Sequence, residues 1–162
     1  MDIRNLKGSI VALVTPFHDD GSVNFEKLRE LVNWHIASGT DAILTLGTTG
    51  ESATMTHEED DDTLRCVIDA AAGRVPVIAE NVVRAERGAV PVIAGTGSNS
   101  TQTMLEKSLR AEALGADGLL LITPYYNKAN PEGMYRHFAA VADAVHIPCI
   151  LYNVPGRTGC AL

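Results

Sequence analysis

The sequence of 162 residues is long enough for one compact domain, and its 46% hydrophobic and 20% charged residues are typical of a globular protein. Its net charge of −7 argues against a nucleic-acid-binding surface. No apolar run is long enough to span a bilayer and no signal peptide is visible, so we expect a cytoplasmic protein with neither a nucleic-acid nor a membrane partner. The three cysteines lack zinc-site spacing and fit free thiols in a reducing cytosol.

Apolar runs and amphipathic segments alternate along the chain. The amphipathic segments predict helices because their apolar residues recur with a helical period. The near-continuous apolar runs predict buried strands of a parallel sheet joined by helical crossovers, which is an α/β fold. In chain order, the expected elements are strand 9–14, a helix capped by Ser22 or Asn24 and ending at 38, strand 42–46, helix 57–72, strand 75–78, helix 100–114, strand 118–122, helix 131–144 and strand 148–152.

A tandem repeat interrupts this alternation. Residues 66–79 and 81–94 match with a period of 15, including Gly73 and Gly88 and a shared Val-Pro-Val-Ile core. Because the repeat occurs only once, it is a local duplication and not a solenoid. We therefore interpret residues 80–94 as a duplicated insertion in a domain that covers residues 1–162. The copied helical part is short for a parallel crossover, so the two copies are not expected to be neighbouring strands.

Polar side chains follow three of the predicted strands. Thr48 and Thr49 lie in a Gly/Thr turn, and residues 123–127 and 152–158 follow two later strands. Ligands bind at this end of the sheet in α/β enzymes. Hydroxyl groups of threonine and tyrosine could relay a proton, and Arg157 could clamp a carboxylate. Taken singly, the turn could equally be an ordinary helix start and each tyrosine a half-buried amphipathic side chain.

Together these motifs resemble the dihydrodipicolinate synthase (4-hydroxy-tetrahydrodipicolinate synthase) family of pyruvate-dependent class I aldolases. The resemblance implies a (β/α)8, or TIM, barrel, of which this chain holds about the first five βα units. The related N-acetylneuraminate lyases share the fold and the Gly-Thr-Thr-Gly-Glu type of turn, but the run from Tyr152 to Thr158 fits the synthases better. The motifs are residues 8–16 (GSIVALVTP), 47–52 (GTTGES), 95–99 (GTGSN), 123–127 (TPYYN) and 152–159 (YNVPGRTG).

The resemblance also implies the chemistry. The family condenses pyruvate with L-aspartate 4-semialdehyde to 4-hydroxy-tetrahydrodipicolinate in lysine and diaminopimelate biosynthesis, through a lysine Schiff base and without a cofactor. Thr48, Tyr126 and Tyr152 match its proton-relay triad, with Tyr152 as the proton donor. Thr49 matches the residue that holds the pyruvate carboxylate, and Arg157 matches the one that binds the semialdehyde carboxylate. Tyr126 would reach across a subunit interface of a homotetramer built as a dimer of dimers.

A lysine-effector site is implied for some members of the family. Asp60 and Thr103 stand where regulated enzymes can carry His and Glu, and this difference argues against lysine inhibition. The positions that match the effector site are Ser52, His57, Asn99 and Tyr125.

The largest departure from the family pattern concerns the nucleophile. The family lysine lies on the sixth barrel strand, and no lysine of this sequence matches that position. We therefore expect an incomplete barrel that is inactive alone, with a non-catalytic barrel fragment as the alternative. The lysines present are Lys7, Lys27, Lys107 and Lys128.

Metal and nucleotide sites are not indicated by the sequence. The acidic run at residues 58–62 is better explained as the first turn of a helix, where carboxylates complement the helix dipole. Ser100 occupies the third glycine position of a dinucleotide-binding motif that would begin at Gly95. We expect neither a metal site nor a nucleotide site.

Overall fold

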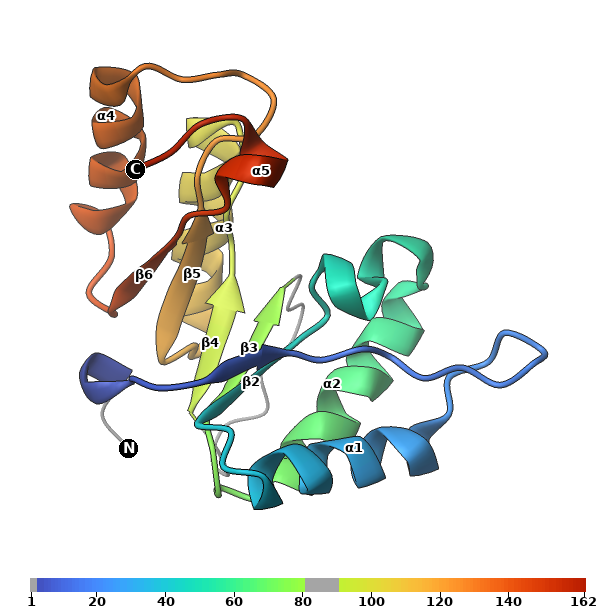
Figure 1. Cartoon of the computed structure of the whole chain (residues 1–162). Coiled ribbons are helices and arrows are strands. Elements are labelled where there is room, and N and C mark those ends of the chain that lie inside the picture. Colours follow the sequence, from blue (N-terminus) through green and yellow to red (C-terminus); the bar gives the residue numbers. More distant parts are fainter. Residues whose placement is uncertain (1–2, 81–90) are drawn as a thin grey trace. The chain divides into compact units, whose positions relative to one another are not determined.

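The computed structural model describes residues 3–80 and 91–162, and the chain divides into two compact units, Met1–Ile93 and Ala94–Leu162 (Figure 1). Each unit alternates parallel strands and helices, as the sequence predicts. Hydrogen-bonded strands follow one another in sequence order, β1-β2-β3 in the first unit and β5-β6 in the second, with β4 where the units meet in sequence. No helix among the described residues is long and apolar enough to cross a membrane.

The first unit contains β1 (Ile10–Ala12), α1 (Phe25–Ala37), β2 (Ala42–Thr45), α2 (His57–Ala71) and β3 (Val77–Glu80). Two short 3-10 helices, η2 (Thr48–Gly50) and η3 (Ser52–Thr54), lie between β2 and α2, and η1 (Ile3–Asn5) precedes β1. The helices α1 and α2 pack against each other (Figure 1). Apolar side chains of both helices and of β2 and β3 form one core, which includes Leu28, Val32, Ile43, Val67 and Val77.

Local sequence signals start the helices of this unit. The Asn24 side chain accepts a hydrogen bond from the Lys27 N–H and caps α1. At α2, Thr56 and Glu59 form a reciprocal capping box, and acidic residues fill the first turn. The acidic run is therefore a helix start, as its position in the sequence predicts.

The second unit contains α3 (Thr101–Leu114), β5 (Gly118–Ile122), α4 (Pro131–Ala142), β6 (Cys149–Tyr152) and a short α5 (Pro155–Thr158). The strands β5 and β6 are parallel, and Leu119 to Ile122 pair in register with Cys149 to Tyr152. Ser100 and Asn130 cap α3 and α4, and Gly115, with φ of 93°, ends α3 in a left-handed conformation. Its largest fully buried side chains are Met104, Leu119 and Leu121.

The expectation that the two copies of the repeat are not neighbouring strands was wrong. The second copy forms β4 (Val92–Gly95), which follows β3 directly in the sheet order. The Val77 N–H donates to the carbonyl of Pro91 at 3.0 Å, just as the Ile43 N–H donates to Pro76 at 3.0 Å. The copied Pro-Val-Ile-Ala segment presents the same backbone hydrogen-bonding groups as the original. It therefore pairs with β3 in the way that β3 pairs with β2. The residues that join the copies, 81–90, lie outside the described part of the chain.

Candidate active site

The turn after β2 is held in an unusual backbone conformation. Leu46 and Glu51 have positive φ values of 60° and 59°. The Thr15 hydroxyl donates to the carbonyl of Gly50 at 2.7 Å, which ties the turn to the segment after β1. A Cβ atom at Gly50 would lie 3.2 Å from the Leu13 carbonyl oxygen, so the close approach favours glycine. Thr48 and Thr49, in the middle of this turn, are exposed.

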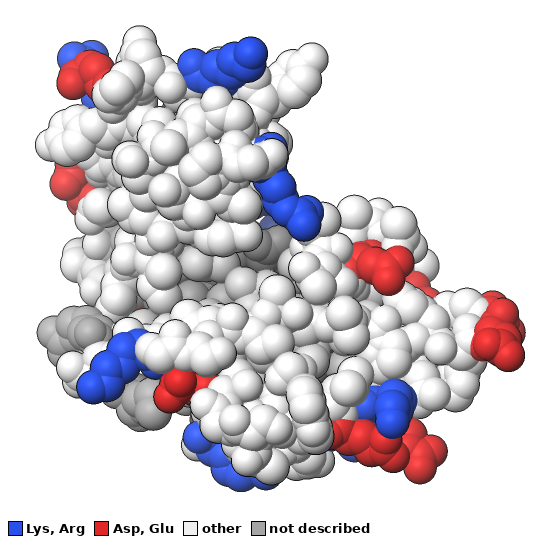
Figure 2. All heavy atoms as spheres, viewed as in Figure 1, with Lys and Arg blue, Asp and Glu red and all other residues white. Residues whose placement is uncertain are grey.

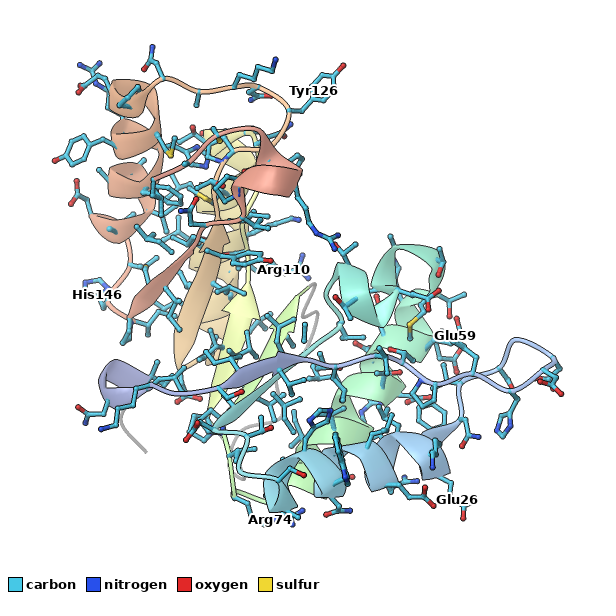
Figure 3. All side chains as sticks on the ribbon, viewed as in Figure 1. Glu26, Glu59, Arg74, Arg110, Tyr126 and His146 are labelled. Atoms are coloured by element: carbon cyan, nitrogen blue, oxygen red, sulfur yellow. The ribbon has the colours of Figure 1, made fainter. Side chains whose placement is uncertain are left out.

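The loop after β5 presents Tyr126 to solvent. Tyr126 is 91% exposed and has a φ of 71°, and its side chain extends from the loop in Figure 3. Asn127 donates from its side-chain amide to the carbonyl of Asn99 at 2.9 Å. The Asn99 amide lies 3.3 Å from the carbonyl of Tyr125 and 3.3 Å from Asn127 Oδ1. This amide pair joins the loop before α3 to the loop that carries both tyrosines, and it stabilises the strained backbone of Tyr126.

The end of β6 lies beside the end of β5. Tyr152 is the last residue of β6 and is 37% exposed. Its carbonyl accepts a hydrogen bond from the Thr123 N–H at 3.0 Å. Arg157 is exposed on α5, whose buried Thr158 hydroxyl lies 3.2 Å from the Val154 carbonyl.

All five residues expected to act in catalysis or substrate binding lie just after, or at, the carboxyl end of a strand. Thr48 and Thr49 follow β2 in the first unit. Tyr126, Tyr152 and Arg157 follow or end β5 and β6 in the second unit. Hydroxyl, phenol and guanidinium groups at strand ends can bind carboxylates and move protons, which suits chemistry on a small carboxylic acid.

The residues matched to the effector site fall into two groups, one in each unit. In the first unit, Ser52 is buried, His57 begins α2, and Asp60 is 7% exposed. Burial raises the pKa of the Asp60 carboxyl, although a hydrogen bond from Ser52 and the nearby His57 oppose the rise. Asp60 Oδ1 has no hydrogen-bond partner among the described residues.

In the second unit, Asn99 contacts the Tyr125 main chain as described above, and the Thr103 N–H bonds to the Ser100 side chain at 3.3 Å. Thr103 is therefore part of the α3 cap. No three His, Cys, Asp or Glu side chains within residues 3–80 and 91–162 are grouped as a metal site would require.

Two residues that shape these loops were not singled out from the sequence. Thr15 was read only as the end of the first strand, yet its hydroxyl holds the turn after β2. His137, on the buried face of α4, lies 2.8 Å through Nδ1 from the Thr101 hydroxyl. Burial lowers the pKa of His137. The sequence could have indicated His137, because it is a polar residue on the apolar face of a predicted helix. No local pattern indicates the role of Thr15.

On the face shown in Figure 2, acidic and basic groups lie in several small mixed clusters, with uncharged areas between the clusters.

The model of the Dihydrodipicolinate synthetase family matches residues 5–82 and 78–162. The chain belongs to this family. It is 54% identical over 155 residues to a 4-hydroxy-tetrahydrodipicolinate synthase of Methylococcus capsulatus, covering 96% of this chain and 48% of that protein. It is 56% identical over 153 residues to the enzyme of Geobacter metallireducens, covering 94% of this chain and 47% of that protein.

Solved structures of the family agree with this assignment. The chain matches a chloride-inhibited dihydrodipicolinate synthase from Acinetobacter baumannii, complexed with pyruvate, with a TM-score of 0.71 and 48% identity over 96% of this chain and 48% of that chain. It matches the synthase from Aquifex aeolicus with a TM-score of 0.68 and 44% identity over the same two shares. The parallel βα fold is thus that of part of a TIM barrel, and the chain spans about half the length of the relatives it matches.

Proposed function

We propose that this chain supplies the residues of the first five strands to the active site of a 4-hydroxy-tetrahydrodipicolinate synthase. The substrates of the whole enzyme would be pyruvate and L-aspartate 4-semialdehyde. The observation that carries the proposal is that Tyr152 and Arg157 lie at and just after the end of β6, which adjoins the end of β5. The relatives named above, at 54% and 56% identity, support the same reaction.

Each side chain has a role that follows from its chemistry. The Tyr152 phenol donates a proton, and Thr48 together with Tyr126 of the partner subunit relays it. The Thr49 hydroxyl and the main chain of its turn hold the pyruvate carboxylate, which is acceptor-only and needs donors. Arg157, exposed on α5, offers a planar pair of N–H groups to the semialdehyde carboxylate.

The nucleophile is the part of the reaction that this chain does not supply. A Schiff-base lysine must lose its proton, and burial is a common way to lower its pKa. Lys7, Lys27, Lys107 and Lys128 are all exposed. Lys27 is 2.7 Å from Glu30, which raises its pKa and makes it a poorer nucleophile. The chain alone would therefore bind the substrates without catalysing their condensation. The alternative is that the chain is a non-catalytic barrel fragment.

The proposal extends to the assembly and the compartment. Tyr126, exposed in this chain, would enter a neighbouring subunit in a dimer of dimers. The protein would act in the cytoplasm and without a cofactor or metal. Residues 80–94 would be an insertion relative to the family, and Asp60 and Thr103 would leave the enzyme insensitive to lysine.

The decisive experiment is to join the chain, without residues 80–94, to the C-terminal half of the Methylococcus capsulatus relative. We expect condensation of pyruvate with aspartate semialdehyde, measured by a coupled reductase assay. A matched chimera with the corresponding N-terminal half of the relative controls for the junction. A folded chimera without activity, beside an active control, would contradict the proposal and favour the non-catalytic fragment. Cleavage of N-acetylneuraminate instead would point to the related lyases.

A further inference from the structure

The pairs β2–β3 and β3–β4 share one hydrogen-bonding pattern. Ile43 at the start of β2 donates its N–H to Pro76, and Val77 at the start of β3 donates its N–H to Pro91, both at 3.0 Å. In each case the acceptor is the proline that precedes the next strand. The edge that β3 offers to β2 is thus the edge that β4 offers to β3.

The two copies are also equal in their side chains. The sequence Pro-Val-Ile-Ala occurs at residues 76–79 and again at residues 91–94. Val77 and Val92 are 0% and 3% exposed, and Ile78 and Ile93 are 1% and 0% exposed. The family model takes up the first copy in its match to residues 5–82 and the second copy in its match to residues 78–162. Neither the backbone edge nor the buried side chains therefore favour one copy over the other as the neighbour of β2.

We infer that β3 and β4 are interchangeable partners of β2, so that the protein exchanges between a ladder with both copies and a ladder with one. In the second state, the Pro91 carbonyl accepts the Ile43 N–H, Val92 takes the place of Val77, and β3 (Val77–Glu80) leaves the sheet. This exchange shifts the pairing by one whole repeat of 15 residues. Each residue of β3 is replaced by its equivalent in β4, so the same side chains point to the same face of the sheet. The family barrel has one strand at this place, so only the shorter ladder is compatible with closure into eight strands.

Disulfide trapping separates the two ladders. Ile43 and Val77 are register partners, so an Ile43→Cys/Val77→Cys variant reports the ladder with both copies. In that ladder Val92 is two strands from Ile43, about 10 Å away, which is beyond the about 7 Å limit for a disulfide. An Ile43→Cys/Val92→Cys variant therefore cross-links only when β4 lies beside β2. Disulfides are formed with oxidised glutathione and identified by peptide mass, which distinguishes them from links to the native Cys66, Cys149 and Cys160.

The control is a Val11→Cys/Val77→Cys variant, because Val11 pairs with Ile43 and so also lies two strands from Val77. We expect the Ile43–Val92 link to form about 10–100-fold more slowly than the Ile43–Val77 link, as for a minor state of about 1–10%, and well above the control. A rate equal to that of the control would overturn the inference, since it would reflect general opening of the sheet.

Hydrogen exchange on the unmodified chain provides a second test that needs no substitution. We expect the amides of Val77, Ile78 and Ala79 to exchange at least about tenfold faster than those of Ile43 and Leu44, because β2 keeps a partner in both ladders while β3 does not. Equal protection of β2 and β3 would contradict the exchange.

Discussion

The Thr123 N–H donates a hydrogen bond to the carbonyl of Tyr152 at 3.0 Å, and this bond fixes the carboxyl ends of β5 and β6 beside each other. Thr123 is fully buried and immediately precedes the loop that carries Tyr126. The two tyrosines proposed for the proton relay are therefore carried by adjoining strand ends within one unit. Their placement depends on the sheet and not on either loop alone.

The first prediction concerns the nucleophile. We expect that the chain incubated with pyruvate and then reduced with borohydride gains no mass, because its four lysines are exposed and the ion pair with Glu30 raises the pKa of Lys27. Intact mass spectrometry measures this directly. A stoichiometric pyruvate adduct on Lys7, Lys27, Lys107 or Lys128 would show that the chain carries its own Schiff-base residue.

The second prediction concerns Tyr152. In the chimera described under the proposed function, Tyr152→Phe should lower kcat by about 10²–10⁴, the range for a positioned acid–base group. Tyr135→Phe is the matched control, because Tyr135 is a 70% exposed tyrosine on the helix α4 and is not part of the proposed relay. Steady-state rates of both variants, with circular dichroism to verify folding, decide the matter. If Tyr152→Phe retained the rate of the control, the phenol would have no part in proton transfer.

The third prediction concerns the buried carboxyl of Asp60. Burial raises the pKa of the Asp60 carboxyl, so the folded protein binds the carboxyl proton more tightly than the unfolded chain does. The unfolding free energy therefore falls as pH rises through the folded pKa and the buried carboxyl ionises. Asp60→Asn should therefore stabilise the first unit at pH 7 by about 1 kcal/mol, with the gain shrinking toward pH 4.

The single tryptophan, Trp34 on α1, reports this unfolding by fluorescence, since α1 packs against α2. Glu58→Gln controls for the loss of a negative charge in the first turn of α2, because Glu58 is exposed. Asp60→Asn less stable than the native chain at pH 7 would mean that the ionised carboxylate is favoured in the fold.

The fourth prediction concerns His137. Burial lowers the pKa of this imidazole, so the unfolded chain binds the proton more readily and the unfolding free energy falls as pH drops below about 6.5. His137→Gln should remove this part of the pH dependence while keeping a polar group near the Thr101 hydroxyl. His146→Gln, at a histidine whose side chain is 93% exposed (Figure 3), is the control. Thermal unfolding is measured between pH 5 and pH 7.5. If the pH dependence of the unfolding temperature were the same in both variants, it would not arise from His137.

The fifth prediction concerns association. The strand β6 ends the sheet order, and its Leu151 and Tyr152 are 46% and 37% exposed. An apolar edge strand pairs readily with other chains, so we expect the chain alone to self-associate and Leu151→Lys to reduce this. Leu109→Lys, at a 42% exposed position on α3, is the control. Light scattering after size exclusion measures the mass, and a monodisperse species of 17.3 kDa with cooperative unfolding would contradict the prediction.

Much of the fold follows from local patterns. Thr56 and Glu59 specify the start of α2, and Gly115 specifies the end of α3, because each satisfies backbone groups of its own helix. The five motifs between residues 8 and 159 together indicated the family, which the comparisons confirm. Strand ends were less well predicted, since the expected strand 9–14 is β1 at Ile10–Ala12. A strand ends where its partner stops pairing, which its own residues do not encode.

Sequence alone determined the alternation of strands and helices, the helix caps and the order of the family motifs, because these depend on residues close together in the chain. Tertiary structure alone decided that β4 lies next to β3, that Asp60 is buried, and that Asn99 and Asn127 join two loops. The positive φ of Tyr126 belongs to the same class, because local propensity opposes it in a residue other than glycine. These features arise from hydrogen bonds and packing between residues distant in sequence, whose free energy exceeds the local preferences.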